Sequence, residues 1–177
     1  MEAPQHSAPG ARPVQTAHTV EIETADRMRD LGRRLARLLR PGDLVLLTGD
    51  LGAGKTTLAR GLGEGLGVRG AVTSPTFVIA RVHPSLGDGP PLVHVDAYRL
   101  GGGLDEMEDL DLDVSLPESV VVVEWGEGRV EELADDRLHV VIERELGAAA
   151  DGDDDVRRVH LTAVGDRWGE ADLTSVG

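Results

Sequence analysis

Two hydrophobic periods alternate along the chain, and their order predicts an α/β domain. Residues 19–23 alternate polar and apolar side chains, which predicts a short strand. Thr24 is a suitable helix N-cap, and Pro41 with Gly42 predicts the end of the helix that follows. The apolar residues of this helix recur on one face, at Met28, Leu31, Leu35, Leu38 and Leu39.

The next segment shows no alternation. Residues 43–48 are apolar almost throughout, which is typical of a strand buried inside a parallel sheet. A glycine-rich stretch follows, and residues 56–66 predict a helix that stops near Gly67. The order strand, glycine-rich loop, helix is therefore predicted here.

Five later segments also predict strands, because they are rich in branched apolar residues and are separated by turn-forming residues. They span residues 76–82, 91–100, 119–125, 136–146 and 156–164. Together the segments predict an α/β fold with a mostly parallel central sheet, flanked by helices and bordered by antiparallel edge strands.

The chain has 177 residues, which is the length of one domain. Residues 1–18 mix proline, alanine and polar residues without a period, and they predict a disordered tail. We assign the folded domain to residues 19–165 and a C-terminal tail to residues 166–177.

The charge balance narrows the function. The chain carries 32 acidic and 18 basic residues, a formal net charge of -14, which repels phosphate backbones and anionic lipids at long range. Binding of DNA or membranes, and direct binding of RNA, is therefore not expected. Without cysteine and without an apolar run long enough to span a membrane, the sequence predicts a cytoplasmic protein.

One lysine stands among the 18 basic residues, all others being arginine, and it lies in the glycine-rich stretch. The stretch fits the phosphate-binding pattern G-x-x-x-x-G-K-[ST] between a predicted strand and a predicted helix, which is the context that the pattern requires. We call residues 49–57 the glycine loop. All of its residues are expected to bind a nucleotide: Gly49, Asp50, Leu51, Gly52, Ala53, Gly54, Lys55, Thr56 and Thr57.

In such a loop, glycines let successive N–H groups turn inward around a phosphate, and the helix N-terminus adds partial positive charge. Lys55 is expected to reach the β- and γ-phosphates as a point charge, which a planar guanidinium would do poorly. The hydroxyl of Thr56 is a suitable Mg²⁺ ligand.

A phosphate site also needs a carboxylate at the end of a neighbouring strand, to hold Mg²⁺ or to polarise water. Glu124 follows a run of valines, and Asp96 ends the run Leu-Val-His-Val-Asp. Both are candidate catalytic and metal-binding residues, and the sequence leaves open which of them touches the metal. The aromatic residues Trp125 and Tyr98 stand close to these acids and are candidates for packing or for stacking near a ligand.

Four motifs follow one another: the glycine loop, Ser-Pro-Thr-Phe at 74–77, His-Val-Asp-Ala-Tyr-Arg-Leu at 94–100 and Val-Glu-Trp at 123–125. In this order and spacing they resemble the TsaE family, the bacterial ATPase of tRNA threonylcarbamoyladenosine synthesis. The resemblance runs over residues 19–165, which is the whole predicted domain.

The resemblance implies a P-loop NTPase-like fold with ATP as the nucleotide. It also implies that Thr56 and Glu124 bind Mg²⁺ and that Asp96 supports them or the attacking water. Residues 74–76 would act as a switch segment near the γ-phosphate, and Trp125 would lie against the nucleotide.

The same resemblance implies that the adenine lies near Thr24 and that an arginine late in the chain takes part, for which we choose Arg157. The chain would hydrolyse ATP as an accessory to a transferase core of TsaB- and TsaD-type proteins. That core modifies adenosine 37 of tRNAs that read codons beginning with A. This chain would meet tRNA only through the complex.

Two other functions remain open on sequence. A small-molecule P-loop kinase is similar in length, but it needs an arginine-bearing lid over the phosphates, whereas residues 104–113 are acidic. A non-hydrolysing nucleotide sensor would use the same binding residues. A GTPase is disfavoured, because guanine selection by Asn-Lys-x-Asp needs asparagine, which this chain lacks.

The predicted first helix is unusually basic, and Asp30 is placed to pair with Arg34 four residues later. This surface is an ordinary solvated face or a docking site for an acidic surface of the transferase partner. Weak RNA binding is a third possibility, which the acidic remainder of the chain opposes. Its arginines are Arg27, Arg29, Arg33, Arg34, Arg37 and Arg40.

Overall fold

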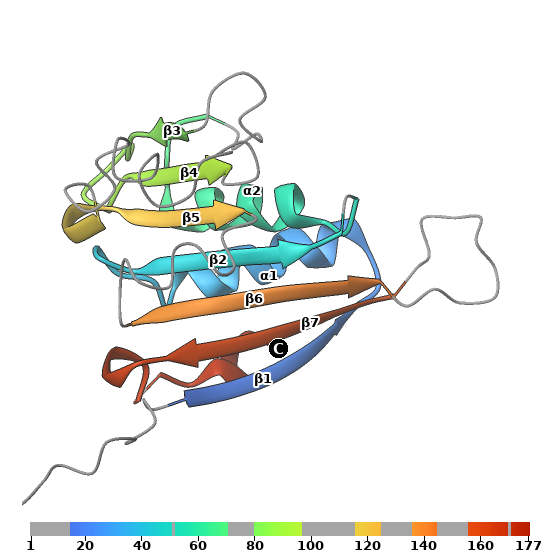
Figure 1. Ribbon diagram of the computed structural model, residues 1–177. Helices are drawn as coiled ribbons and strands as arrows, with labels where there is room; N and C mark the ends of the chain where they lie inside the picture. The colour runs from blue at the N-terminus through green and yellow to red at the C-terminus, as the bar shows by residue number, and fades with distance from the viewer. Residues whose placement is uncertain are drawn as a thin grey trace, which may run out of the picture.

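The computed structural model describes residues 15–50, 52–70, 80–96, 116–124, 136–144, 156–169 and 171–177. A seven-stranded sheet has the order β1-β7-β6-β2-β5-β4-β3, and both described α-helices pack on one of its faces (Figure 1). The strands are β1 (Gln15–Ile22), β2 (Leu44–Gly49), β3 (Ala80–His83), β4 (Leu92–Asp96), β5 (Val120–Glu124), β6 (Arg137–Arg144) and β7 (Arg157–Val164). The helices are α1 (Ala25–Ala36) and α2 (Lys55–Leu66). No helix of the described residues is long and apolar enough to cross a membrane.

Strand direction divides the sheet into a centre and two edges. The central strands β6, β2, β5 and β4 are parallel, as predicted. Strands β7 and β1 on one side and β3 on the other run antiparallel to their neighbours. The sheet as a whole is therefore mixed rather than mostly parallel. The reason is that β3 and β4, and also β6 and β7, follow each other in the chain and lie side by side, and a parallel arrangement would need a crossover connection between them.

Helix α1 begins where the sequence predicts and ends earlier. The hydroxyl oxygen of Thr24 accepts a hydrogen bond from the Arg27 N–H at 3.1 Å, which confirms the N-cap. The helix ends at Ala36, so the predicted end at Pro41 was placed too late. The next N–H groups bond to carbonyls three residues back instead of four, which tightens the chain into the turns of residues 37–43.

Helices α1 and α2 meet backbone to backbone. Added Cβ atoms on three helical glycines would collide with atoms of the facing helix, and we call these residues the glycine seam: Gly32, Gly61 and Gly65. Because no side chain separates the two backbones, α2 is fixed closely against α1. Helix α2 ends at Gly67 with φ +71°, as predicted.

The basic face of α1 is partly neutralised by acidic residues. Arg29 forms an ion pair with Glu64 of α2, and Arg33 Nε lies 2.8 Å from the other oxygen of the same carboxylate. The expected pair within α1 is confirmed, with Arg34 Nη2 and Asp30 Oδ2 2.7 Å apart. Two arginines that the sequence left available for docking are thus engaged in packing the helices.

The C-terminal residues pack on the core. Two 3-10 helices, η4 (Asp166–Trp168) and η5 (Leu173–Val176), follow β7. Trp168, Leu173 and Val176 are 1%, 1% and 2% exposed and belong to the same apolar cluster as the helices. The assignment of residues 166–177 to a tail was therefore wrong, because these apolar side chains lie inside the domain core.

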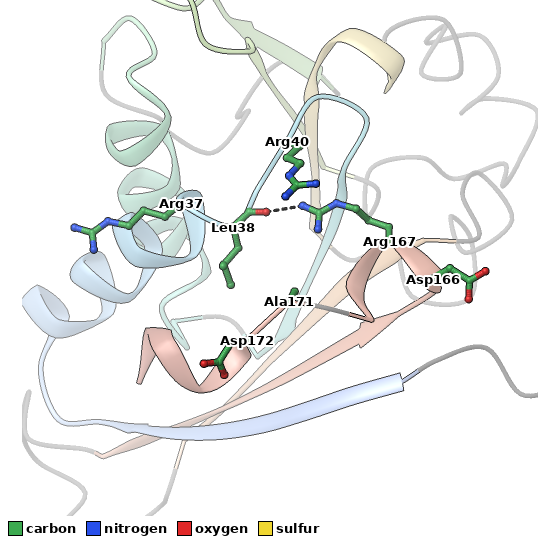
Figure 2. A pocket seen from close by; sticks show the side chains of 7 residues that line it. All are labelled: Arg37, Leu38, Arg40, Asp166, Arg167, Ala171 and Asp172. Atoms are coloured by element: carbon green, nitrogen blue, oxygen red, sulfur yellow. Dashed lines mark hydrogen bonds between the residues drawn. The ribbon is translucent and has the colours of Figure 1, made fainter.

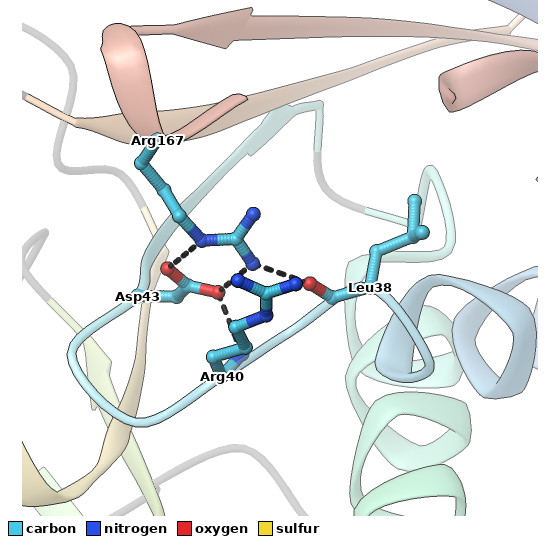
Figure 3. Close-up of polar contacts among 4 residues, drawn as sticks. All are labelled: Leu38, Arg40, Asp43 and Arg167. Atoms are coloured by element: carbon cyan, nitrogen blue, oxygen red, sulfur yellow. Dashed lines mark hydrogen bonds and ion pairs between the residues drawn. The ribbon is translucent and has the colours of Figure 1, made fainter. Parts of the chain in front are cut away.

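A partly buried ion pair fixes this C-terminal segment to the turn before β2 (Figure 3). The guanidinium of Arg167 donates from Nε to Asp43 Oδ1 at 3.2 Å and from Nη2 to Asp43 Oδ2 at 2.9 Å. Nη2 also donates to the Leu38 carbonyl at 2.6 Å. We call this group the latch.

The N-terminal boundary also differs from the prediction. Strand β1 begins at Gln15, four residues before the predicted domain start at residue 19. Residues 1–14 lie outside the described part of the chain.

Candidate functional site

The glycine loop joins the end of β2 to the start of α2, as the sequence predicts. Its backbone turns through left-handed conformations at Gly52 (φ +81°) and Gly54 (φ +114°), where a side chain would be strained. Gly54 is the N-cap of α2, so the first N–H groups of the helix lie at the loop. This is the backbone arrangement that binds anions at a helix N-terminus.

The Lys55 side chain lies folded into this loop. It is 7% exposed, and its Nζ donates to the carbonyl oxygens of Gly49 at 2.5 Å and Asp50 at 3.2 Å. Burial lowers the pKa of Lys55, while the negative charges of Glu124, Asp50 and Asp96 act in the opposite direction. The ammonium group is thus held close to the loop carbonyls and near three acidic side chains. A phosphate oxygen is charged and would be a stronger hydrogen-bond acceptor than these neutral carbonyls.

The two candidate acids lie at the loop end of the sheet. Asp96 and Glu124 are the last residues of neighbouring parallel strands and are directly paired in register. Glu124 is also paired with Leu47, two residues before Gly49. The structure therefore brings both acids to the strand end from which the glycine loop starts.

Glu124 is buried and incompletely satisfied. It is 4% exposed, and its Oε1 has no hydrogen-bond partner among the described residues. Its Oε2 lies 3.6 Å from Nε2 of His94, which is outside hydrogen-bond distance. A buried carboxylate oxygen without a partner is costly unless a ligand or ion satisfies it.

These residues fit a Mg²⁺ ion bound together with phosphates. The described residues contain no group of three or more His, Cys, Asp or Glu side chains that would hold a metal alone. Mg²⁺ in nucleotide sites usually takes one or two carboxylates, a hydroxyl and phosphate oxygens. Thr56, in the first turn of α2, and the unsatisfied oxygen of Glu124 are donors of that kind.

A small cavity of about 100 Å³ opens beside the glycine loop. Its walls come from the start of α1, from the loop and from the start of β7, and they include Ala25, Met28, Thr57 and Arg157. Arg157 Nη2 donates to the Gly52 carbonyl at 3.3 Å. The residue chosen from the late part of the chain thus lies next to the loop. Thr24 precedes the cavity wall, and its hydroxyl caps α1.

Sequence reasoning missed Arg144. It is the cross-strand partner of Arg157, so both side chains start on the same face of the sheet. The Nη1 atom of Arg144 lies 3.9 Å from the position a Cβ on Gly52 would take. The sequence shows both arginines, but the register that pairs them is a long-range property.

Sequence reasoning also gave no role to His94. Its side chain is fully buried, and both ring nitrogens lack a hydrogen-bond partner among the described residues. On the neighbouring strand, burial lowers the pKa of His83, and the charges of His94 and Arg81 lower it further. Buried imidazoles therefore extend from Glu124 towards the edge strand.

Four predicted features lie outside the described residues. They are Leu51, Trp125, Tyr98 and the switch segment at 74–76.

Comparison with known proteins gives the family. The model of the family described as threonylcarbamoyl adenosine biosynthesis protein TsaE matches residues 22–150, more than half of the chain. The chain belongs to the TsaE family. The matched range contains the glycine loop, Asp96 and Glu124, and it ends before Arg157.

Individual members of the TsaE family are similar over most of the chain. The tRNA threonylcarbamoyladenosine biosynthesis protein TsaE of Streptomyces coelicolor is 76% identical over 147 residues, which are 83% of this chain and 97% of that protein. The Bacillus subtilis protein of the same name is 41% identical over 145 residues, which are 81% and 84% of the two chains. The crystal structure of Bacillus subtilis YdiB matches with a TM-score of 0.65 at 34% identity, covering 88% of this chain and 90% of that one. The resemblance drawn from four short motifs is confirmed.

Proposed function

We propose that this chain binds and hydrolyses ATP with Mg²⁺ and, as an accessory to a transferase complex, supports threonylcarbamoyl modification of tRNA. Membership of the TsaE family supports the pathway, since the relatives are named as tRNA threonylcarbamoyladenosine biosynthesis proteins. The observation that carries the nucleotide part is the buried Lys55 ammonium, which lies inside the glycine loop in the field of Glu124 and Asp96.

Binding follows from the loop and its surroundings. The N–H groups at the start of α2 would donate to phosphate oxygens, and Lys55 would exchange its bonds to loop carbonyls for a bond to the β- and γ-phosphates. The cavity bounded by Ala25 and Met28 would take the base or ribose. Arg157, which contacts the loop at Gly52, would add positive charge on that side.

Hydrolysis needs a positioned water and neutralised charge. Thr56 and Glu124 would hold Mg²⁺, which supplies charge neutralisation between the phosphates. Asp96, directly beside Glu124, would orient the attacking water or support the metal ligands. In the alternative assignment, Asp96 would bind the metal and Glu124 would orient the attacking water.

The proposed partners are TsaB- and TsaD-type transferase proteins, and tRNA is reached through them. Slow turnover by the isolated chain is expected, because phosphoryl transfer depends on charge stabilisation that a partner can complete. The formal net charge of -14 is unfavourable for independent tRNA binding.

The test is phosphate release from ATP and Mg²⁺, measured with and without the transferase proteins, together with nucleotide affinity. In Glu124→Gln, we expect nucleotide binding to persist and hydrolysis to fall about 100-fold, because the amide has the same shape without the charge. Glu143→Gln is the matched control, since this exposed glutamate lies on β6 and pairs with His160.

The outcomes separate the possible functions. If Glu124→Gln has the turnover of the wild type, Asp96 is the residue that binds the metal. A phosphorylated small molecule in place of free phosphate would indicate a kinase. Tight nucleotide binding without any product, alone and with partners, would indicate a sensor and contradict the proposal.

A further inference from the structure

A second and larger cavity lies at the opposite end of the domain from the glycine loop. It has a volume of about 410 Å³ and lies between the turn after α1 and the C-terminal segment (Figure 2). Its lining residues are Arg37, Leu38, Arg40, Asp166, Arg167, Ala171 and Asp172. Helix α1 starts beside the nucleotide cavity, and its 12 residues span roughly 18 Å before this second cavity is reached. We call it the distal cavity.

Guanidinium groups dominate its polar lining. Arg40 and Arg167 extend towards each other from opposite walls, and their guanidinium groups lie side by side in two views (Figures 2 and 3). Arg37 points outward at the rim (Figure 2). Within the described residues, no ion pair of the Arg37 or Arg40 side chain is found, whereas Arg167 is held by Asp43.

The acidic groups nearby do not balance this charge. Asp43 lies beside the two guanidinium groups (Figure 3), and both of its carboxylate oxygens already accept hydrogen bonds from Arg167. Asp166 points away from the cavity (Figure 2), and Asp172 accepts hydrogen bonds from the backbone and hydroxyl of Thr174. Among the described residues, two guanidinium groups and one carboxylate therefore meet at this wall of the cavity, and an entering anion would relieve the repulsion between the two cations.

The remaining lining is apolar. Leu38 and Ala171 are partly buried and pack against the hydrophobic core. The distal cavity thus combines a cationic wall with an apolar floor, which suits a ligand that has a carboxylate next to an aliphatic group.

From these observations we propose that the distal cavity is a docking site for an acidic segment of a protein partner. One carboxylate of the segment enters between Arg40 and Arg167, and a neighbouring aliphatic side chain rests on Leu38 and Ala171. Paired guanidinium donors bind carboxylates in a bidentate manner, and arginine is enriched among the residues that dominate protein interfaces.

A protein segment fits this site better than a nucleic acid or free phosphate. The net charge of -14 opposes the approach of RNA, a polyanion, at long range. Free phosphate would use the cationic wall and leave the apolar floor uncovered. A segment that carries single carboxylates between apolar residues uses both.

The experiment is an NMR titration of the nucleotide-free chain with the peptide acetyl-Glu-Leu-Glu-amide. We expect saturable shifts of the backbone amides of residues 37–40, 42–43, 166–169 and 171–172, and none with acetyl-Gln-Leu-Gln-amide at equal concentrations. Arg40→Gln should lower the affinity for the peptide about 10-fold, because one charge-assisted contact is lost. Arg69→Gln is the matched control and should leave the affinity unchanged, because Arg69 is an exposed arginine after α2 that does not line the distal cavity.

Several results would overturn the proposal. These are equal shifts with both peptides, no shift with either, unchanged affinity in Arg40→Gln, or stronger shifts of the same amides with inorganic phosphate or tRNA. If Arg40→Gln unfolds the chain, Arg37→Gln takes its place and should weaken binding less, since Arg37 lies at the rim. No nucleotide is present in this titration, so its outcome is independent of the ATPase experiment.

Discussion

The two ends of the sheet differ in whether the oxygens of a buried carboxylate have hydrogen-bond partners. At the distal end, Asp43 is 5% exposed and accepts hydrogen bonds from Arg167 and from the Arg40 backbone, so its carboxylate is satisfied. At the glycine-loop end, Glu124 is equally buried, and one of its oxygens has no partner among the described residues. Among those residues, the carboxylate of Asp43 thus has hydrogen-bond partners for both oxygens, whereas that of Glu124 does not.

The difference separates a stabilising role from a binding role. A buried polar atom without a partner costs about 1 to 3 kcal/mol, and more when it belongs to a charged group, so a ligand or ion that satisfied Glu124 would remove a substantial cost. The latch therefore contributes to holding the fold together. Glu124 is a buried carboxylate with an oxygen left unsatisfied by the described part of the chain, and it lies beside the glycine loop, where a ligand is expected to satisfy it.

The largest expected effect is at Lys55. Replacing it in Lys55→Ala should lower nucleotide-dependent phosphate release about 1000-fold, because the charge directed at the phosphates is lost. Lys55→Arg should be nearly as inactive, since a planar guanidinium does not fit the loop as a point charge does. Steady-state turnover measures both variants, and substantial turnover in Lys55→Arg would refute the argument from this single lysine.

The second-largest effect should be a loss of stability at the distal end. Removing one side of the latch in Asp43→Ala leaves Arg167 partly buried without its carboxylate and should lower the free energy of unfolding by about 3 kcal/mol. Chemical denaturation measures this change, and Asp166→Ala, which removes an exposed carboxylate of the same segment, should have little effect. Nucleotide affinity measured on folded Asp43→Ala should remain normal. A large loss of affinity would mean that the two ends are not separate.

A smaller effect is expected for Arg144. Because this arginine lies beside Gly52 and opposite Arg157, Arg144→Gln should weaken ATP binding about 10-fold. Titration with a fluorescent ATP analogue measures the affinity. The control is Arg158→Gln on the next position of β7, whose side chain lies near Glu21. Equal affinities of the two variants would remove Arg144 from the site.

The smallest effect is a pH dependence carried by His83. Burial lowers its pKa in the folded chain, so the unfolded chain binds the proton more readily once the pH falls below the ordinary value of 6.5. Wild-type stability should therefore decrease as the pH falls through that value. Denaturation at pH 7.5 and 5.5 should show a smaller decrease for His83→Gln than for wild type, and an equal decrease would exclude His83 as the cause.

Local patterns predicted the parts of this protein that depend on neighbouring residues. The strand, loop and helix around Lys55 and the Thr24 cap follow from short stretches of sequence. The positions of Asp96 and Glu124 at strand ends also came from local apolar runs. Their pairing in register supports placing them together, while their chemical roles stay predictions.

Long-range contacts escaped sequence reasoning. The opposition of Arg144 and Arg157 depends on strand register, and the engagement of Arg29 by Glu64 depends on how two helices cross. The C-terminal residues were missed because their apolar side chains follow neither the helical nor the strand period. Trp168 was the available signal, since a large aromatic residue is rarely left in a solvent-exposed tail.

The glycine seam has a consequence for anyone who wishes to engineer a heat-stable form of this protein. Glycines inside helices are usual targets for replacement, because alanine at such positions typically adds about 1 kcal/mol of helix stability. At Gly32, Gly61 and Gly65 the same replacement would push the two helices apart, and Lys55 begins one of them. Replacements chosen for helix propensity alone would therefore loosen the glycine loop, and these three positions should be kept fixed in any library.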